Sequence, residues 1–404
     1  MMKAWKKIRL GDACKTNTNS YSPKEEWDFV NYLDTGNITD NRIDSIQYID
    51  VKSEKLPSRA RRKVKNDSII YSTVRPNQRH FGIIKSQPEN FLVSTGFAVI
   101  DADAQILDAD FLYYVLTQAT LVEALHAIAE QSTSAYPSIK PSDIEDLEIE
   151  IPYIATQKKI ADILGSLDRK IAQNTEVNDN LLQQINAIFK RWFTDNPEVD
   201  SMTQVPLADL CTVVTKGTTP TTLGKPFVSE GINFIKAESI QDNHSIDKNK
   251  FAYIDDETNT LLKRSIISDG DIVFTIAGSL GRFAIVDDSV LPANTNQAVA
   301  IIRADVNKVT PEYLYSFFLG NWHNDYYTKR IQQAVQANLS LGTIKSLPIP
   351  VLSDRSMSEY LGLITPLIAM TKSNEQEISK VVQVRDALLP RLMSGELDVS
   401  SLDI

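Results

Sequence analysis

The amino-acid sequence predicts an α+β protein with an internal repeat: two similar domains of mixed helix and sheet, separated by a long antiparallel two-helix coiled coil and related by a pseudo-twofold axis. Three observations support this prediction. The chain has 404 residues, which is long enough for two domains of ordinary size. The phrase Leu-x-Asp-x-Cys begins at Leu10 and begins again at Leu207. Two long segments, 153–195 and 355–396, carry apolar residues at the alternating three- and four-residue spacing of a coiled coil.

The repeat extends well beyond the two opening phrases. Further matches follow in the same order along both halves, at offsets that stay between 197 and 203 residues. The matched pairs are Pro23 with Pro220, 31–38 with 233–240, 66–73 with 269–276, 111–113 with 313–315, and Ile144, Leu147 and Ile149 with Ile344, Leu347 and Ile349. Insertions in loops produce such a small drift when the elements between the loops are shared. We therefore predict the same series of elements twice.

The first part of each repeat, 1–152 and 203–352, is predicted to be a domain in which short strands form a mostly antiparallel or mixed sheet. Runs such as SIIYSTV, FAVI, DIVFTI and AVAII are rich in β-branched and aromatic residues and are bounded by Gly, Asn, Pro and Asp. No regular crossover helices separate them, and short helices are expected around 110–130 and 311–336. The aromatic residues of these helices recur at helical spacing, and we predict that they belong to the core: Tyr113, Tyr114, Tyr315, Phe317 and Phe318.

The second part of each repeat is predicted to be a long helix. In 153–195 the apolar seam is interrupted near its centre by Asn174 and Asn178, and Asn374 takes the place equivalent to Asn174 in the second helix. If the helices pair antiparallel, their centres meet, and the asparagines can bond each other and fix the register. The alternative is a frame shifted by one residue, which puts these asparagines on the surface. Gly395 suits the C-terminal end of the second helix.

The overall composition indicates a globular chain and sets few limits on its partners. Hydrophobic residues make up 42% of the chain, and the formal net charge is −10. Basic residues nevertheless concentrate between positions 52 and 85. The negative net charge of the whole chain therefore does not exclude a positively charged surface in that region. There is no apolar run long enough to span a membrane and no apolar signal segment after the basic start, so we expect no membrane partner and a cytoplasmic location. Cys14 and Cys211 fall at the same place in the repeat, and we expect two equivalent, half-buried thiols.

The sequence contains none of the common catalytic or metal-binding motifs. It lacks a phosphate-binding glycine loop, a Gly-x-Ser-x-Gly turn, a His-Glu-x-x-His helix and any Cys-x-x-Cys pair, and its four histidines are dispersed. It also lacks the Asn-Pro-Pro-Tyr tetrapeptide of amino-methyltransferases. We therefore expect a non-catalytic chain with no catalytic residues, no metal site and no cofactor of its own.

The strongest candidate for a nucleic-acid contact in the first domain is its basic region. One part is the run PSRARRKVK, and the other is STVRPNQRH, which follows a predicted strand. Arginine makes paired bonds to guanine edges, asparagine and glutamine make them to adenine, and the remaining cations suit phosphates. The plain alternative is a solvated basic loop. The candidate residues are Arg59, Arg61, Arg62, Lys63, Arg75, Asn77, Gln78 and Arg79.

The second domain offers a different set of candidates. Its KGTTPTTLGKP stretch supplies hydroxyls and backbone amides that suit a phosphate, although such a stretch is also typical of a simple turn. AGSLGR stands where the first domain has its 75–79 turn, and it carries less charge. Two domains that recognise different DNA sequences would differ in this way. Two domains whose loops have simply diverged would differ in the same way. The candidate residues are Thr218, Thr219, Lys225, Lys236, Lys263, Arg264, Ser279 and Arg282.

The chain resembles the specificity subunit of a type I restriction–modification system along essentially its whole length. The most telling segments are QKKIADILGSLDRKIAQNTEVNDNLLQQINAIFKRWF at 157–193 and RDALLPRLMSGELDV at 385–399, which resemble the central and C-terminal conserved regions of that family. GTTP at 217–220 and the two Leu-x-Asp openings also fit. The start of the second long helix, SMSEYLGLITPLIAM, departs from the family pattern.

The resemblance implies that the two domains are target-recognition domains and that each reads one half of a bipartite site in double-stranded DNA. It also implies that the long helices set the gap between the halves and dock two modification subunits, which carry S-adenosylmethionine and methylate adenine. Restriction subunits join through the modification subunits and cleave with ATP and magnesium. On the residues alone, two other hypotheses stay open: a non-catalytic protein–protein scaffold with two binding modules, and an enzyme whose site no motif reveals.

Overall fold

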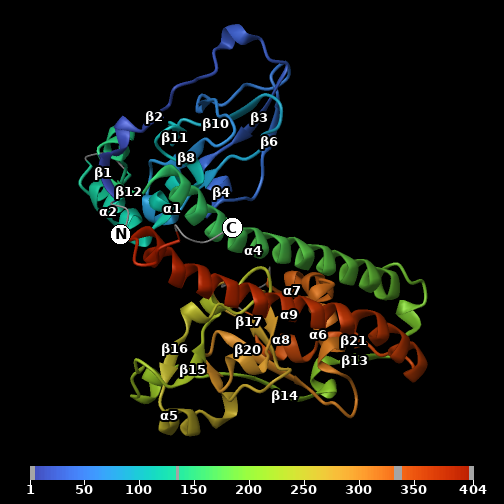
Figure 1. Cartoon of the computed structure of the whole chain (residues 1–404). Coiled ribbons are helices and arrows are strands. Elements are labelled where there is room, and N and C mark those ends of the chain that lie inside the picture. The colour runs from blue at the N-terminus through green and yellow to red at the C-terminus, as the bar shows by residue number, and fades with distance from the viewer. Residues whose placement is uncertain (1–4, 133–135, 332–338, 400–404) are drawn as a thin grey trace. The chain divides into compact units, whose positions relative to one another are not determined.

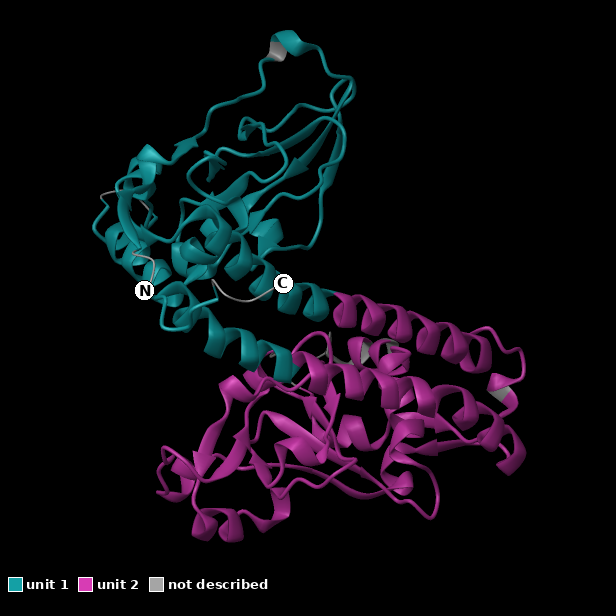
Figure 2. Ribbon diagram, in the orientation of Figure 1, with its two compact units in different colours: residues 1–172, 379–404 teal, residues 173–378 magenta. Residues whose placement is uncertain are grey.

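A computed structural model describes residues 5–132, 136–331 and 339–399. It divides into two compact units, one made of Met1–Ala172 with Ser379–Ile404 and the other of Gln173–Ile378 (Figure 2). Both boundaries fall inside long helices. Each unit therefore contains one domain of the repeat together with one end of each long helix.

Among its described residues, the domain of the first unit contains two four-stranded sheets, two two-stranded sheets and three short α-helices. Figure 1 shows how these elements are arranged. Its strands are β1 (Lys6–Arg9), β2 (Cys14–Thr16), β3 (Phe29–Leu33), β4 (Ile38–Thr39), β5 (Arg42–Ile43), β6 (Gln47–Asp50), β7 (Ala60–Arg62), β8 (Ile69–Ser72), β9 (Phe81–Ile83), β10 (Phe91–Ser94), β11 (Phe97–Ala102) and β12 (Glu148–Ile151). Its helices are α1 (Ala109–Thr117), α2 (Ala119–Glu130) and α3 (Pro141–Glu145). The sheet β2-β11-β8-β9 is antiparallel, and the sheet β6-β3-β10-β7 contains one parallel pair, β3 with β10.

The domain of the second unit repeats this design. Its strands are β13 (Gln204–Pro206), β14 (Cys211–Lys216), β15 (Ile232–Ile235), β16 (Ala252–Ile254), β17 (Ile272–Thr275), β18 (Phe283–Ile285), β19 (Ala293–Thr295), β20 (Val299–Ala304) and β21 (Pro348–Pro350). Its helices are α5 (Asp256–Leu261), α6 (Pro311–Leu319), α7 (Trp322–Ile331) and α8 (Leu341–Lys345). The antiparallel sheet is β14-β20-β17-β18, and the second sheet, β16-β15-β19, again has one parallel pair, β15 with β19.

The order and pairing of these elements confirm the internal repeat. The amide of Leu10 donates to the carbonyl of Leu147 over 2.8 Å, and the amide of Leu207 donates to the carbonyl of Leu347 over the same distance. Both opening leucines are fully buried, which explains why the phrase recurs. The two domains differ at β7. In the described part of the second unit its counterpart is only an isolated β-bridge between Ile267 and Ala293.

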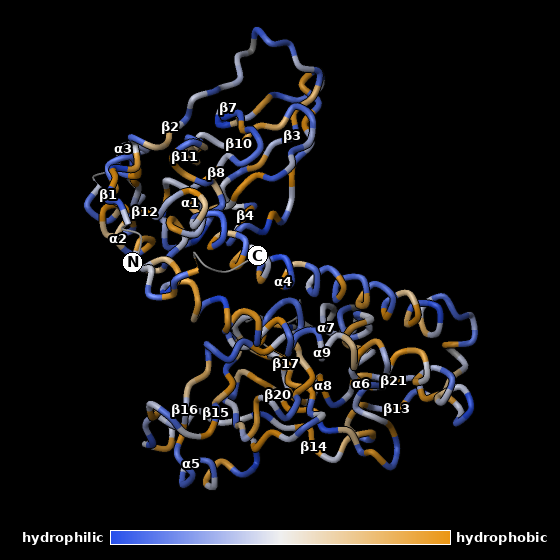
Figure 3. Tube along the Cα trace, in the orientation of Figure 1, coloured by the Kyte–Doolittle hydropathy of each residue, from blue (hydrophilic) through white to orange (hydrophobic). Residues whose placement is uncertain are grey.

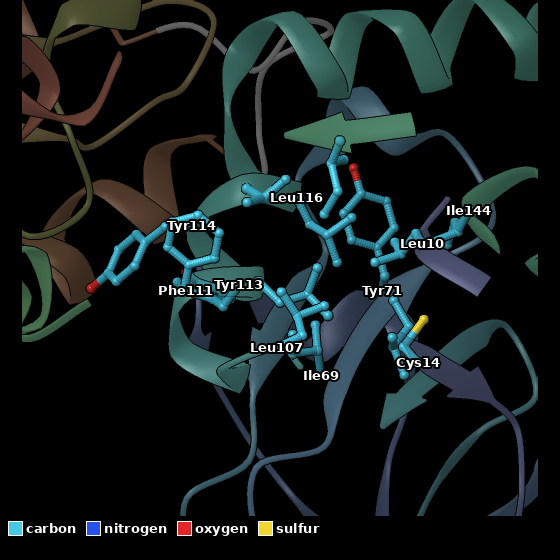
Figure 4. Close-up of a cluster of buried hydrophobic side chains, with 14 of the residues drawn as sticks. Leu10, Cys14, Ile69, Tyr71, Leu107, Phe111, Tyr113, Tyr114, Leu116 and Ile144 are labelled. Atoms are coloured by element: carbon cyan, nitrogen blue, oxygen red, sulfur yellow. The ribbon is translucent and has the colours of Figure 1, made fainter. Parts of the chain in front are cut away.

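The largest core cluster of each domain lies between its antiparallel sheet and the first helix after it, and a smaller cluster lies between that sheet and the second sheet. The side chain of Asp108 caps α1 by accepting from the amide of Phe111 over 3.0 Å, and Thr310 caps α6 in the same way. Figure 4 shows part of the first core, with Leu10, Tyr71 and Phe111 in one cluster. The prediction for the helix aromatics is confirmed, because all five are buried: Tyr113, Tyr114, Tyr315, Phe317 and Phe318.

The long helices are α4 (Ile154–Phe189), which continues into a π-helical turn at Lys190–Thr194, and α9 (Asp354–Met393). In Figure 3 their tubes mix hydrophobic and hydrophilic segments, as expected of helices with one apolar side. The helix α9 continues through Pro366, which is exposed. It ends at Met393, and Gly395 follows with a backbone φ of +74°. That left-handed conformation suits glycine, as predicted.

The polar centre of the helix seam differs in one detail from the expectation. Asn174 and Asn178 are 7% and 8% exposed, so the alternative frame that put them on the surface is wrong. Asn174 and Asn374 do not bond each other. Asn374 donates instead to the Oδ1 atom of Asn178 over 2.8 Å, and Asn174 donates to Oε2 of Glu377 over 2.8 Å. In an antiparallel helix pair a residue faces its own counterpart only at the centre of the pair, and Asn174 and Asn374 lie just to one side of that centre.

The two cysteines sit at the same point of the two antiparallel sheets but differ in burial. Cys14 pairs with Ala102 and Cys211 with Ala304, which are equivalent residues of β11 and β20. Cys14 is buried and Cys211 is half-buried, so the expectation of two half-buried thiols is wrong for the first. Burial raises the pKa of both thiols to about 12.

In the part of the chain that the structure describes, no single helix is long and apolar enough to cross a membrane. The helices α1 and α2 reach the required length and composition only as a pair bent by 66°.

Candidate nucleic-acid interface

One edge of the antiparallel sheet in the first domain gathers several of the predicted residues. The end of β8 lies beside the start of β11, because Ser72 pairs with Phe97. The loop that follows β8 therefore lies beside the turn that precedes β11, and the amide of Thr73 donates to the carbonyl of Gly96 over 2.8 Å. Arg59 is at the same place, because its carbonyl accepts from the amide of Thr95 over 2.8 Å. We call Arg59, 73–80 and 95–96 the first edge.

The centre of the first edge is a short 3-10 helix, η4 (Pro76–Gln78), which packs against α2. Pro76 is buried, while Asn77 and Gln78 are exposed. Arg75 and Arg79 flank this turn with φ values of +47° and +58°. Residues other than glycine rarely adopt such backbone angles. The turn therefore holds two arginines in an unfavourable conformation, and this conformation exposes the residues between them.

The two flanking arginines have different surroundings. The Nε atom of Arg79 lies 2.6 Å from Oδ1 of Asp40, and its guanidinium lies 5.1 Å from the ring centre of Phe81. Arg75 is exposed and lies 5.5 Å from the ring centre of Tyr136. Arg79 is therefore held by a carboxylate, whereas Arg75 lies against an aromatic ring and has no carboxylate within 4.0 Å among the described residues.

The basic run at 57–65 contains a short edge strand between two irregular segments. Its centre forms β7, which pairs with β10. Side chains alternate along a strand, so the run does not direct all its cations to one surface. Arg61 is exposed, whereas the Nε atom of Arg62 is buried. Lys63 forms an ion pair with Glu25 and lies 5.0 Å from the ring centre of Trp27.

Arg59 is the member of this run that reaches the first edge. A Cβ atom placed on Gly96 would lie 3.2 Å from its Nη2 atom. The pKa of the nearby Asp34 is lowered: burial opposes the shift, but the amide of Thr35, neighbouring hydroxyls and the charge of Arg59 outweigh it. Arg59 thus stands beside an ionised carboxylate, at the start of β7.

The second domain presents the corresponding edge with other side chains. The amide of Gly217 donates to the carbonyl of Asn296 over 3.0 Å, and the amide of Ile276 donates to the carbonyl of Ala298 over 2.8 Å. The ends of β14 and β17 and the start of β20 therefore come together. We call 217–219, 264, 276–282 and 296–298 the second edge.

A polar cluster forms the centre of the second edge. The Nη2 atom of Arg264 donates to Oγ1 of Thr218 over 3.2 Å. The amide of Thr219 donates to Oε1 of Gln297 over 3.1 Å, and the hydroxyl of Thr219 donates to the same oxygen. Thr219 is therefore occupied, while the exposed amide group of Gln297 keeps its two N–H donors. Gln297 is absent from the sequence-based candidates.

Other predicted cations of the second domain are engaged in ion pairs. Lys225 lies 2.7 Å from Glu257, and Lys236 lies 2.8 Å from Glu238. Arg282 makes two bonds to the carboxylate of Asp242, of 2.7 and 2.6 Å. Lys263 and Ser279 are exposed. The structure thus places Ser279 and Arg282 in the β17–β18 loop of the second edge, and the predicted set is spread over several loops and does not form a single patch.

The loop between β17 and β18 is the counterpart of the η4 turn. Gly278 and Gly281 have φ values of +76° and +88°, at the places that Arg75 and Arg79 occupy in the first domain. The same left-handed positions are thus filled by glycine in one domain and by arginine in the other. The scaffold is shared and the exposed chemistry differs.

A family model for the type I restriction modification DNA specificity domain matches the chain twice, at residues 2–183 and 200–381. The chain belongs to this family. The two matches follow the two halves of the repeat, and each extends over one domain and part of a long helix.

Relatives in this specificity family cover nearly the whole chain. The HindI specificity subunit of Haemophilus influenzae is 25% identical over 469 residues, covering 98% of this chain and 100% of the relative. The MjaIX specificity subunit of Methanocaldococcus jannaschii is 23% identical over 423 residues, covering 98% of this chain and 94% of the relative. A solved type I restriction–modification S subunit from M. genitalium has the same fold, with a TM-score of 0.61, 15% identity, and coverage of 97% of this chain and 96% of that one.

Proposed function

We propose that this chain is the DNA-recognition subunit of a type I restriction–modification complex and that each domain reads one half of a bipartite site through its edge. The observation that carries the proposal is that the same sheet edge recurs in both domains with different exposed side chains. Two domains with the same fold and different exposed side chains suit a protein that recognises two different half-sites, one with each domain.

The exposed side chains suggest which residues read bases. Asn77, Gln78 and Gln297 are exposed amides, and amides make paired bonds to adenine in the major groove. Arg75 suits guanine, because its guanidinium has no carboxylate partner within 4.0 Å among the described residues. In this proposal Arg61 and Lys263 contact phosphates.

The lysines and arginines that form ion pairs have a structural role in this proposal and do not contact DNA. Lys63, Arg79, Lys225, Lys236 and Arg282 each have a carboxylate within ion-pair distance. Releasing an arginine or lysine from such a partner costs part of the energy that a phosphate contact returns. We therefore assign these residues to holding the loops in shape.

The chemistry belongs to partner subunits in this proposal. Two modification subunits dock on the long helices, bind S-adenosylmethionine and methylate adenine. Restriction subunits join through them and cleave with ATP and magnesium. Membership of the specificity family and the lack of catalytic motifs in the sequence support a recognition role without catalysis.

Salt-dependent binding tests the proposal. The chain, assembled with its modification subunits, is titrated with duplex DNA over a range of salt concentrations. We expect affinity to fall steeply as salt rises, since phosphate contacts release counterions, and one gapped sequence to be preferred. Arg61→Gln and Lys263→Gln should each weaken binding to all sequences alike and lower the salt slope by about one.

Lys308→Gln is the matched control, because Lys308 lies beyond the far end of β20 and pairs with Asp305. Its salt slope should equal that of the unaltered chain. Binding that prefers no sequence, or a salt slope that Arg61→Gln and Lys263→Gln both leave unchanged, contradicts the proposal.

A further inference from the structure

A half-buried polar network joins the first domain to the long helices within the first unit. Arg385 of α9 donates from Nη1 to Oδ1 of Asp168 on α4 over 2.9 Å. The hydroxyl of Tyr114 on α1 donates to the other carboxylate oxygen of Asp168 over 2.6 Å. One carboxylate therefore links three helices, and both of its oxygens are used.

The network is partly shielded from water. The side chains of Arg385 and Asp168 are 30% and 32% exposed, and Tyr114 is buried. Burial raises the pKa of the Tyr114 phenol, and the charge of Asp168 raises it further, so the hydroxyl remains a donor. Burial lowers the pKa of Arg385, but its bonds to Asp168 and Asp386 outweigh this and raise it overall. Tyr114 and Arg385 thus both remain hydrogen-bond donors.

Aromatic contacts connect this network with the first edge. Tyr113, the neighbour of Tyr114 on α1, packs edge-to-face on Phe81 at 6.4 Å between ring centres. Phe81 begins β9, directly after the η4 turn, and Arg79 lies over its ring. The helix α1 therefore lies between the network and the candidate base-reading turn.

The second domain lacks this network at the equivalent positions. The counterparts of Asp168 and Arg385 are Ile368 and Ile185, both buried in the core of the second unit. The counterpart of Tyr114 is Ser316, whose hydroxyl donates to the carbonyl of Tyr313 in its own helix over 2.7 Å. One repeat thus uses directional hydrogen bonds where the other uses apolar contact.

The hydrogen-bonded network of the first domain and the apolar contact of the second differ in how strictly they fix the orientation of the helices. Apolar burial is non-directional, whereas hydrogen bonds to a carboxylate depend strongly on distance and angle. An ion pair of this kind also adds little net stability relative to well-packed apolar residues. Its effect is therefore expected on orientation more than on stability.

We propose that Tyr114, Asp168 and Arg385 are positioning residues that hold the first domain in one orientation on the long helices, and so restrict the chain to one gap length between half-sites. This inference rests on the proposed function. It assigns to these residues no contact with DNA. They act through α1 on the first edge.

The second domain supplies the test variant, D168I/R385I, which gives the first unit the isoleucine pair of the second. The probes are the gapped sequence that methylome sequencing identifies for the unaltered chain, and duplexes with the gap one base pair longer or shorter. Binding is measured for the full chain with its modification subunits. We expect the preference for the correct gap to fall about tenfold, which corresponds to about 1.4 kcal/mol. The thermal unfolding midpoint should change by only a few degrees, because the new apolar contact offsets the cost of leaving the Tyr114 hydroxyl without its acceptor.

Two further variants guard against a simple folding defect. Tyr114→Phe removes only one hydroxyl and should lower the gap preference in the same direction, by a smaller factor. D168R/R385D restores an ion pair with its charges exchanged and should recover part of the preference. As a control, R355Q/E359Q removes an exposed ion pair from α9 and should change neither quantity.

The outcomes separate this inference from the proposed function. If the unaltered chain directs no gapped motif at all, the proposed function fails. If the unaltered chain prefers one gap and both D168I/R385I and Tyr114→Phe keep the same preference, the function stands and the positioning role is wrong. Loss of stability in parallel with loss of preference in Tyr114→Phe also overturns it, because the residues are then merely structural.

Discussion

Arg75 and Arg79 show how the first edge is built at the scale of single residues. Both have left-handed backbone angles, which cost roughly 1 kcal/mol or more for a residue other than glycine. The second domain avoids this cost with Gly278 and Gly281 at the same places. Arg79 pairs with Asp40 and holds the turn in shape. Arg75 is exposed, and an arginine at a place where glycine suits the backbone better indicates that this side chain has a use besides folding.

Replacing Arg75 with glycine separates that use from stability. The change relieves the backbone strain but makes the unfolded chain more flexible, so we expect the free energy of unfolding to change by less than about 1 kcal/mol. Loss of the guanidinium should weaken binding to the cognate DNA by about 1–3 kcal/mol. Chemical denaturation and gel shift with the assembled complex measure the two effects.

Gly278→Ala is the reverse control at the equivalent position of the second domain. It adds a side chain at a φ of +76° and should destabilise the fold by about 1 kcal/mol. An Arg75→Gly variant that loses stability and keeps full DNA affinity contradicts the assignment of Arg75.

Glu375 is a second residue whose surroundings lead to a prediction. It lies on α9 among apolar residues of the second unit that include Ile185 and Tyr315. Burial raises the pKa of its carboxyl group from 4.5 to about 8, the nearby Asp287 adds to the rise, and Lys372 opposes it. The group is therefore mainly protonated at neutral pH in the folded chain.

Stability should depend on pH through Glu375. Its pKa is higher in the folded than in the unfolded chain, so its stabilising contribution is complete below about pH 4.5 and is lost as the pH rises through 8. The loss is at most about 1.4 kcal/mol per pH unit. The unfolding midpoint of the unaltered chain should fall more between pH 5 and pH 8.5 than that of Glu375→Gln. Parallel curves for the two chains rule out a titrating Glu375.

The burial of single residues was predictable where a pattern fixes it. Tyr113 and Phe317 recur at helical spacing, and both are in the core. The bonding partners of single polar residues were not predictable, because they depend on the stagger of elements far apart in the sequence. Asn374 meets Asn178 and not Asn174 for this reason.

At the scale of elements, strand alternation explains why the basic run is not one patch. Arg61 and Arg62 are neighbours in β7, so their side chains point to opposite faces of the sheet. Sequence composition shows the charge but not the strand, because basic residues are poor indicators of β structure. The location of Gln297 was hidden likewise, since only the pairing of β14, β17 and β20 brings it to the second edge.

The junction of α6 and α7 gives a prediction about packing. A Cβ atom on Gly320 would lie 2.1 Å from Cδ1 of Phe189 on α4, so the absence of a side chain allows the junction to approach that helix. We expect Gly320→Ala to destabilise the second unit by about 1–3 kcal/mol. Differential scanning calorimetry of the full chain measures the change.

Gly362 is the matched control on α9. It is exposed, and apart from its chain neighbours and the adjacent backbone of α9, no atom of the described residues lies within 4 Å of an added Cβ. Gly362→Ala should stabilise the helix by about 1 kcal/mol, because glycine is a poor helix former. Equal effects from the two glycine substitutions contradict the packing account.

At the scale of the whole molecule, the repeat was the most predictable feature. Leu10 and Leu207 are core residues with equivalent backbone bonds, so the phrase that contains them is retained in both halves. The edges were only partly predictable. Their loops carry no such packing constraint, and their relation to each other arises from sheet pairing.

The central claim is that two edges on one chain read two halves of one DNA site. Methylome sequencing tests it most directly, in strains that express the unaltered chain, Asn77→Ala/Gln78→Ala or Gln297→Ala, with Gln105→Ala as a control beyond the far end of β11. We predict one gapped motif for the unaltered and control chains, relaxation of one half by the first variant, and relaxation of only the other half by the second. A motif without a gap, or variants that relax both halves equally, would contradict the claim.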